Sequence, residues 1–355
     1  MKKYLLSLFL AVSVGIILAP VALAHEAYVL PAFEFQAGLK TDAANPLAPL
    51  IDPQHLKVFI TIGILVALSY LIIIIWSTTK FSDILDKVVR KAAVIGPLII
   101  RIAISAAFFF SAQANVILGP ELPLSQVPYG GAIRLFLFIA SFMIITGTLT
   151  ELAAALGIIA YFYVSSVFGF YMITYTNYLG ELLVLFLFGS RFLSFDGLFF
   201  GQKRWIEKMS DYRFLETPIV RILYGVALIY AGYTIKFLHQ GLTVDVYNQY
   251  HLGDFFHATA QFIAAGAGLS ELMIGFFILI GFSMRWTILI SLVFITLSIL
   301  YFRELLWPHL MLYGISFSLL INSGDKYTID KYMVPWVRGV LKKAFKGDST
   351  GKQLQ

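Results

Sequence analysis

Glu271 is the side chain that the sequence singles out for chemistry. It lies near the middle of an apolar stretch, residues 258–281, where a carboxylate is costly and normally faces a partner or a water-filled cavity. Lys236 and Arg221 lie toward opposite ends of another apolar stretch, and the rise of a helix leaves Glu271 at a depth between them. Either long cationic side chain could therefore reach its carboxyl group.

Two interpretations of Glu271 follow. In the first, it is a proton-carrying or quinone-contacting carboxyl group, and Lys236 and Arg221 belong to the same site. In the second, it belongs to a buried ion pair, or it is a neutral acid bonded to a helix hydroxyl such as Ser291 or Thr296. The residue types alone leave both interpretations open.

The six histidines are the other candidate ligands. His25 would be the first residue of an exported chain, and its ring and free amine could chelate copper together. His257 and His309 open two apolar stretches at similar depth and could hold a haem between them. In a third interpretation the histidines are interfacial residues on a face that lacks Lys and Arg, because no HxxxH or HExxH spacing marks a metal site.

Other residues bear on a redox role. The sequence contains no cysteine, which excludes disulfides, iron–sulfur clusters and covalently attached haem, so a redox role would need a bound organic or haem cofactor. One aromatic group could flank a flat ring such as a quinone, or simply pack the helices: Tyr161, Tyr163, Phe168 and Tyr171. Four charged residues are expected at the outer surface as solvated groups: Glu181, Glu304, Arg134 and Arg303.

The composition predicts that these residues are carried by membrane helices. Hydrophobic residues make up 59% of the chain and charged residues 13%, whereas soluble domains average about 25% charged. Such a chain cannot cover itself with polar surface. We expect an all-α, polytopic membrane protein, with spans of roughly 20 residues across a core of ~30 Å. The nine predicted spans lie near 57–77, 93–114, 132–148, 151–172, 178–197, 218–237, 258–281, 286–302 and 306–322.

The distribution of basic residues predicts an orientation. Residues 1–24 have the positively charged N-terminal region, the apolar stretch and the small-residue cleavage site of an export signal. Cleavage there would leave the mature N-terminus outside. Lys and Arg gather in alternate loops and in the tail, so these loops are assigned to the cytoplasm of a plasma-membrane protein. The net charge of +6 then points to lipid headgroups as partners, and not to nucleic acid.

One pattern occurs twice along the chain, in residues 97–201 and 218–330. Each copy has a Pro and an Arg opening an apolar helix, a polar outer loop, two apolar spans on a tight turn, and a fourth span that closes on an Asp. The closing aspartates are Asp196 and Asp325. Because each copy has an even number of spans, the pattern predicts two parallel four-helix bundles.

The second copy contains Arg221-Ile222-Leu223-Tyr224-Gly225, Gly232, Lys236, Glu271, Gly275, Gly281 and the exit Asn322-Ser323-Gly324-Asp325. On these residues it resembles the DoxX-like family of integral membrane proteins. The first copy is similar in Arg101, Gly180-Glu181 and Ser194-Phe195-Asp196, but Val116 stands where Lys236 would align and no acid matches Glu271. The resemblance implies a tandem of four-helix bundles and, for some relatives, a place in quinone-linked or other redox assemblies.

Six regions are therefore expected along the chain: the signal 1–24, an extracytoplasmic segment 25–56 with little core of its own, an extra helix 57–77, bundles 93–201 and 217–330, and a basic cytoplasmic tail 331–355. No nucleotide fingerprint, phosphate-binding loop or nucleophile triad is present. Three function classes remain. The first is a non-catalytic subunit or accessory of a membrane redox or respiratory assembly. The others are a small-solute or proton transporter or channel, and a scaffold that binds an exported partner.

Overall fold

The computed structural model describes residues 26–41, 45, 53–77, 79, 84, 87, 89, 91–189, 194–199, 209–322 and 325–346 of the chain. Within these ranges the chain is helical, apart from a short ribbon in which β1 (Val116–Ile117) pairs antiparallel with β2 (Gly119–Pro123). The predicted export signal and His25 lie outside the described residues.

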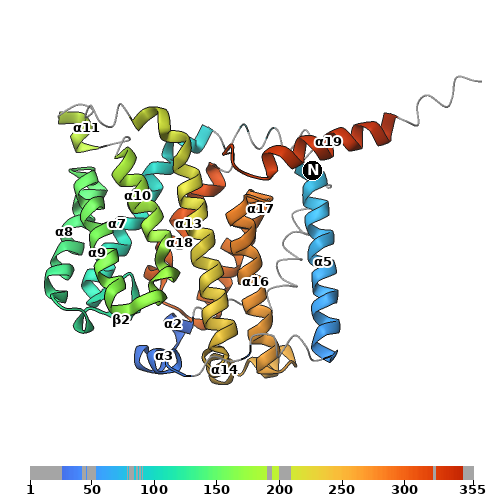
Figure 1. Ribbon diagram of the computed structural model, residues 1–355, viewed down its shortest axis with the longest axis horizontal. Helices are drawn as coiled ribbons and strands as arrows, with labels where there is room; N and C mark the ends of the chain where they lie inside the picture. Colours follow the sequence, from blue (N-terminus) through green and yellow to red (C-terminus); the bar gives the residue numbers. More distant parts are fainter. Residues whose placement is uncertain are drawn as a thin grey trace, which may run out of the picture.

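The long helices are apolar and close to the predicted spans. They are α5 (Pro53–Ser77), α7 (Gly96–Ala114), α8 (Gly130–Thr146), α9 (Thr150–Phe168), α10 (Thr176–Phe188), α13 (Glu216–Ala231), α16 (Ala260–Ile280), α17 (Met284–Phe302) and α18 (Leu306–Ile321). Figure 1 shows them running roughly alongside one another.

Five helical stretches among the described residues are long and apolar enough to cross a membrane: Gly96–Ala114, Thr150–Phe188, Asp211–Leu238, Ala260–Ile280 and Met284–Phe302. These stretches indicate a membrane protein. The second of them bends back on itself, because the 3-10 segment η3 (Gly169–Tyr175) joins α9 to α10 and the two helices pack together. Shorter apolar helices cover Val66–Trp76, Gly130–Thr146 and Leu306–Ile321.

The helices pack in two groups of four, which we call the first quartet (α7, α8, α9, α10) and the second quartet (α13, α16, α17, α18). In each quartet the first helix packs on the second and the third on the fourth. The quartets join through two contacts, because α10 packs on α13 and α18 packs on α7 (Figure 1). The last helix of each quartet therefore lies against the first helix of the other.

The two quartets make the same connection between their second and third helices. Gly147 ends α8 with φ 72° and Gly281 ends α16 with φ 69°, a left-handed conformation that suits glycine. Asp196 then accepts the backbone N–H of Leu149 at 2.9 Å, and Asp330 accepts that of Ser283 at 2.7 Å. Each aspartate thus satisfies a free donor at the start of the third helix.

One arginine in each quartet binds the carbonyl groups that the end of the second helix leaves free. Arg101 donates to the carbonyls of Ile144 at 3.0 Å and Ile145 at 2.7 Å. Arg221 donates in the same way to Ile278 at 3.2 Å and to Leu279.

The aspartate that corresponds to Asp196 by its contacts is Asp330. The sequence pattern had paired Asp196 with Asp325. Asp325 instead forms an ion pair with Arg221 at 3.0 Å, whereas Asp330 makes the helix-starting contacts described above. The pattern placed the aspartate five positions too early because both residues follow the last apolar helix.

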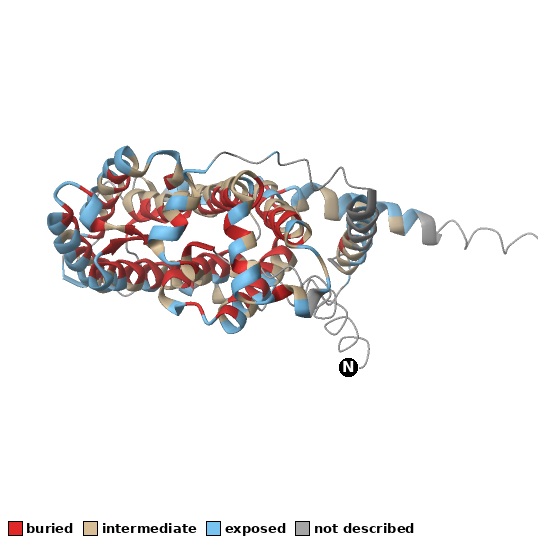
Figure 2. Ribbon diagram, turned by 90° about the horizontal axis from the view of Figure 1, so that it is seen from below, coloured by how far each residue is buried: buried red, intermediate tan, exposed pale blue. Residues whose placement is uncertain are grey.

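Buried residues concentrate between the packed helices of the two quartets (Figure 2). α5 lies at one side of this core and contacts it through a few aromatic residues. The hydroxyl groups of Tyr70 and Thr287 are 3.2 Å apart, and the rings of Trp76 and Trp286 meet edge to face with centroids 5.9 Å apart. Much of the remaining α5 surface is exposed and apolar, as expected of a helix in contact with lipid.

A second, smaller core lies at the opposite end from the basic tail. It is formed by α2 (Glu26–Val29), α3 (Ala32–Gly38) and α14 (Gln240–Gln249), which Figure 1 shows together at the lower edge. Phe35 is fully buried there, with Leu242 and Val246. The segment 25–56 was expected to have little core of its own, but its helices α2 and α3 pack on β2 and α14 and share this core with the ends of α13 and α17.

The C-terminal end of α13 has an unusual turn. The helix continues from Ala231 into a π-helical segment, η5 (Gly232–Leu238), which carries Lys236. A π segment widens the helix by one residue per turn and often marks a functional position. Here it leads directly into the small core around α14.

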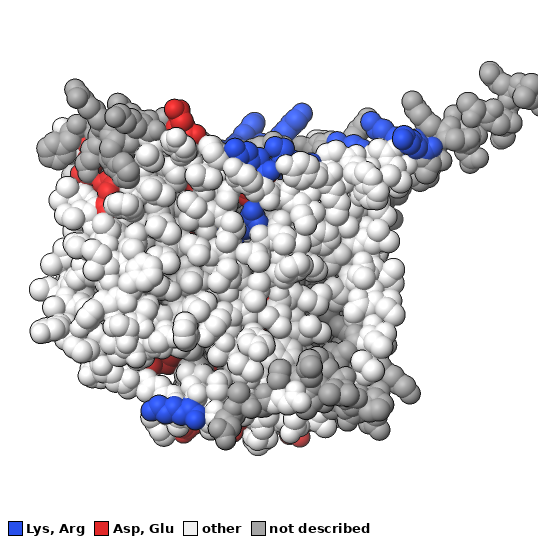
Figure 3. Space-filling model, viewed as in Figure 1, with Lys and Arg blue, Asp and Glu red and all other residues white. Residues whose placement is uncertain are grey.

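The basic residues gather at one end of the molecule. On the face drawn in Figure 3, Lys and Arg lie mainly along the upper edge, beside α19 (Asp330–Lys346), above a broad band of uncharged residues. α19 runs past the upper end of α5 (Figure 1) and alternates basic with apolar residues. This arrangement suits a helix that lies at a membrane surface.

Candidate functional site

Lys236 and Glu271, the first sequence candidates, lie together in a buried ionic cluster. The Lys236 ammonium group is 3.9 Å from the Glu271 carboxylate, and it is closer still, at 2.7 and 2.8 Å, to the two carboxylate oxygens of Glu26. Thr243 also donates to Glu26 at 2.7 Å. All three charged side chains are almost completely buried. Sequence reasoning missed Glu26, because it lies far from Lys236 in the chain.

The geometry favours the ion-pair interpretation of Glu271. Ser291 and Thr296, the hydroxyl partners considered for a neutral acid, are engaged elsewhere: Ser291 with Tyr224 at 3.4 Å and Thr296 with the Leu292 carbonyl at 2.7 Å. Gly232 allows the approach of the two helices, because a Cβ atom there would lie 3.2 Å from that of Glu271. One lysine between two carboxylates is an arrangement that holds three elements together.

Arg221, the third candidate of this group, does not reach Glu271. Its guanidinium group is occupied by the carbonyls at the end of α16 and by Asp325. The residue therefore has a structural role, because it satisfies free carbonyl groups at the end of α16.

His257 and His309, the candidate haem ligands, are in different environments. His257 is exposed in the loop before α16, whereas His309 is completely buried in the first turns of α18. The Nε2 atom of His309 is 2.8 Å from a carboxylate oxygen of Glu304, and its Nδ1 atom is 2.9 Å from the Leu305 carbonyl oxygen. Each ring nitrogen of His309 thus lies beside an oxygen atom of the same chain.

Glu304 and Glu181 are buried, although both were expected at the surface. Glu304 accepts a hydrogen bond from Ser298 and contacts His309, so its burial is explained by partners within the same connection. Glu181 is 0% exposed in the middle of α10, and among the described residues neither of its carboxyl oxygens has a hydrogen-bond partner. Arg134 and Arg303 are exposed, as predicted.

A second polar cluster surrounds Glu121, a residue of the loop between α7 and α8 that sequence reasoning did not single out. One carboxyl oxygen accepts hydrogen bonds from the hydroxyl groups of Tyr171, at 2.8 Å, and Tyr175. The other oxygen has no partner among the described residues. Burial raises the pKa of Glu121 to about 7, and the bonds from the two tyrosines only partly offset this. A carboxyl group with this pKa can exchange a proton near neutral pH.

The secondary structure around Glu121 explains the position of this cluster. The ribbon of β1 and β2 brings Glu121 next to η3, which carries Tyr171 and Tyr175. Gly119 is required at the turn of the ribbon, because a Cβ atom there would overlap the Tyr175 hydroxyl. The aromatic run that begins at Tyr161 was the available sequence signal, but no pattern linked it to an acid more than 40 residues earlier.

Glu121 lines a groove of about 300 Å³ between α3, β2 and η3. The apolar part of its wall contains Phe35, Leu39, Leu122, Val167 and Phe168, and the polar part contains Gln36, Lys40, Gln126, Glu121 and the Tyr171 hydroxyl. Gln36 and Gln126 are fixed by hydrogen bonds between their amide groups, at 3.0 and 3.4 Å. Of the four aromatic residues predicted to flank a ring, Phe168 and Tyr171 line this groove.

The remaining two aromatic residues have other roles. Tyr161 is buried and donates to the Met172 carbonyl at 2.6 Å, and Tyr163 donates to the Pro128 carbonyl at 3.0 Å. In the part of the chain that the structure describes, no group of three or more His, Asp or Glu side chains is placed to hold a metal ion. The predicted copper ligand His25 falls outside that part.

Comparison of the chain with family models, with curated proteins and with solved structures finds no match. The functional argument therefore rests on the groove and on the buried polar clusters themselves.

Proposed function

We propose that this protein is a membrane-embedded subunit or accessory of a quinone-linked redox assembly, and that the groove between α3 and η3 receives the quinone or quinol ring. The single observation that carries the proposal is the placement of Glu121, an acid with a pKa of about 7, in a groove walled by aromatic and aliphatic side chains. In this role the protein holds the ring and exchanges a proton with it. A partner subunit would exchange the electrons.

The size and lining of the groove support a ring-shaped, partly polar ligand. Its volume of about 300 Å³ is at the lower end of the range for small-molecule sites, which are mostly apolar with a few placed polar groups. Phe168 and Phe35 offer flat apolar surface, and the amide groups of Gln36 and Gln126 offer donors to a quinone oxygen. A quinol hydroxyl could donate to the free oxygen of Glu121.

A lipid-soluble ligand also suits the surroundings of the groove. Phe33 and Phe170 are largely exposed, and each is two residues away from a phenylalanine of the groove wall. Exposed aromatic residues of this kind are typical of a membrane interface. A ligand dissolved in the bilayer would meet them before the polar groups.

Photolabelling tests this proposal. The purified protein in lipid nanodiscs is irradiated with an azido-substituted benzoquinone, digested, and its labelled peptides are identified by mass spectrometry. We expect the label on residues 35–40 or 167–171, competition by unlabelled quinone, and weaker labelling in Glu121→Gln. Glu34→Gln, an exposed acid on the same α3 helix, is the matched control. Label spread evenly over lipid-facing helices, with no effect of Glu121→Gln, would overturn the proposal.

We also propose that the two quartets are tandem copies of one DoxX-like bundle with nine membrane spans in all. The matching roles of Arg101 and Arg221, and of Asp196 and Asp330, support the repeat. The basic end beside α19 supports a plasma-membrane orientation with the C-terminus in the cytoplasm and the groove outside.

Introduced cysteines test this orientation cleanly, because the chain has none of its own. An impermeant maleimide added to intact cells should label Tyr129→Cys, an exposed position before α8, and should leave Lys342→Cys on α19 unlabelled until the cells are opened. The reverse result would place the groove in the cytoplasm.

The scaffold alternative has less support. The segment proposed to bind an exported partner uses Phe35 and Glu26 to pack on its own chain.

A further inference from the structure

We propose that Glu121, Tyr175 and Tyr28 form a proton-transfer route from the outer groove to an internal cavity, and that Glu181 is the proton acceptor at its inner end. The route goes beyond ring binding and needs no quinone, because water in the groove can supply the proton.

The route begins at Glu121 because this residue lines the groove and is hydrogen-bonded to two residues of a second space. It lines the groove, and it accepts hydrogen bonds from Tyr171 and Tyr175, which line a separate cavity between α2, η3, α13 and α18. Tyr171 itself borders both spaces. A proton that reaches the carboxyl group from the groove is therefore one hydrogen bond away from the cavity.

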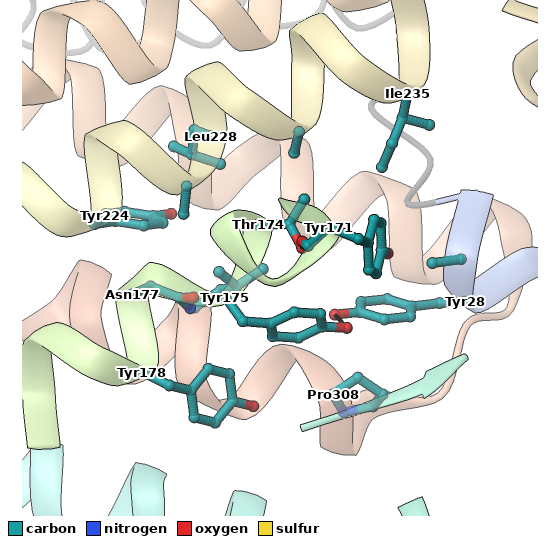
Figure 4. Close-up of a pocket in the computed structure, with 14 residues that line it drawn as sticks. Tyr28, Tyr171, Thr174, Tyr175, Asn177, Tyr178, Tyr224, Leu228, Ile235 and Pro308 are labelled. Atoms are coloured by element: carbon teal, nitrogen blue, oxygen red, sulfur yellow. Dashed lines mark hydrogen bonds between the residues drawn. The ribbon is translucent and has the colours of Figure 1, made fainter. Parts of the chain in front are cut away.

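The next step passes between phenol groups. The hydroxyl groups of Tyr175 and Tyr28 are 3.5 Å apart, and Figure 4 shows the side chains of Tyr28, Tyr171 and Tyr175 gathered around the same space. Each hydroxyl can accept a proton on its oxygen while it passes its own proton onward. One proton is transferred in this way, no bond other than O–H is broken, and no electron moves.

The cavity can hold the water needed to continue the route. Its volume of about 40 Å³ exceeds the ~15 Å³ that one water molecule requires. The wall includes the side chains of Asn177 and Tyr178 (Figure 4). The Asn177 side-chain oxygen is buried and has no partner among the described residues, and such a polar atom normally binds buried water.

Glu181 lies one helical turn beyond the cavity wall. It is four residues after Asn177 and three after Tyr178 on α10, so the three side chains share a face of the helix. Within the described residues its carboxyl group has no hydrogen-bond partner, and its side chain is fully buried. A carboxylate without a partner at this depth is very costly, so the group must hold a proton and must receive it from somewhere. Asn177 and Tyr178, on the same face of α10, connect Glu181 with the cavity wall.

Hydrogen–deuterium exchange followed by infrared spectroscopy tests the route in the quinone-free protein in nanodiscs. The C=O stretch of a protonated carboxyl group shifts when its proton is replaced by deuterium. We expect Glu181→Gln to remove one such band and Glu181→Asp to move it. Exchange at this band should slow by about tenfold or more in Tyr175→Phe and in Tyr28→Phe, because each variant removes one transfer group.

Tyr161→Phe is the matched control, because Tyr161 is also a buried phenol but bonds to a backbone carbonyl outside the cavity. Thermal unfolding of each variant shows whether it keeps the fold. The proposal is overturned if no band depends on Glu181, or if Tyr175→Phe and Tyr28→Phe exchange as fast as Tyr161→Phe. Failure of the quinone labelling would leave this result unaffected, so the two proposals are judged separately.

Discussion

The carboxylate of Glu26 lies 2.7 Å from the ammonium group of Lys236, although the two residues are 210 positions apart in the chain. Lys236 in turn contacts Glu271 on the neighbouring helix α16. The segment that contains α2 and α3 is therefore attached to the second quartet by buried charges as well as by the small apolar core. Removing any one of these three buried charges would leave the remaining ones with fewer charged partners.

Glu26→Gln should lower the free energy of unfolding by about 3 kcal/mol, because Lys236 would keep only the more distant Glu271. The measurement is the unfolding midpoint in mixed detergent micelles. Glu34→Gln, on the exposed side of α3, should change the stability by less than about 0.5 kcal/mol. Equal midpoints for the two variants would show that the buried cluster contributes little.

The raised pKa of Glu121 predicts a pH dependence of stability. The pKa is about 7 in the folded chain and near 4.5 in the unfolded chain, so between these values the folded state holds one more proton. The contribution of Glu121 to stability should therefore be fully present below about pH 4.5 and should be lost, by on the order of 3 kcal/mol, as the pH rises to about 7.

Glu121→Gln should remove this contribution to the pH profile, because the amide does not titrate. Unfolding midpoints of the two proteins measured at a series of pH values give the difference directly. Parallel profiles for the wild-type and variant proteins would contradict the shifted pKa.

Asp196→Ala and Asp330→Ala should each lower stability by about 1–2 kcal/mol, because each removes the acceptor for a free N–H group at the start of a helix. Asp254→Ala, an exposed aspartate in a short helix, is the control. Thermal unfolding of the three variants measures the effect. A large loss in only one quartet would mean that the two turns are not energetically equivalent.

Glu304 and His309 should behave as a coupled pair. Glu304→Gln and His309→Asn should each cost about 2–3 kcal/mol, since each leaves a buried polar partner behind. The double variant should lose less than the sum of the two. A double-mutant cycle on the unfolding free energies measures the coupling, and strict additivity would argue against the contact.

The sequence predicted the apolar helices well because their hydropathy is a local property. The ends of α7, α9 and α17 lie within a few residues of the predicted spans. The pairing of Lys236 with Glu271 could also be predicted, because a charged side chain within an apolar helix needs a partner of opposite charge.

The polar clusters could not be predicted in the same way, because they join distant segments. Glu26 meets Lys236 across 210 positions and Glu121 meets Tyr175 across 54. The misplacement of Glu181 and Glu304 has a local cause: each lies near the end of a predicted apolar span, where an acid is usually solvated. Helix packing buries Glu181, and the contacts with Ser298 and His309 accompany the burial of Glu304.

Because Gly232–Leu238 is π-helical, the direction of the Lys236 side chain depends on the number of residues in this segment. In a regular α-helix each residue advances the side chains by about 100°, so removing one residue between Gly232 and Lys236 would rotate the lysine away from both carboxylates. The shortened helix would keep a complete backbone hydrogen-bond ladder while its ammonium group pointed at lipid or at α14. A deletion here would thus leave the secondary structure intact and disconnect the segment that begins at Glu26, an outcome quite unlike that of any substitution.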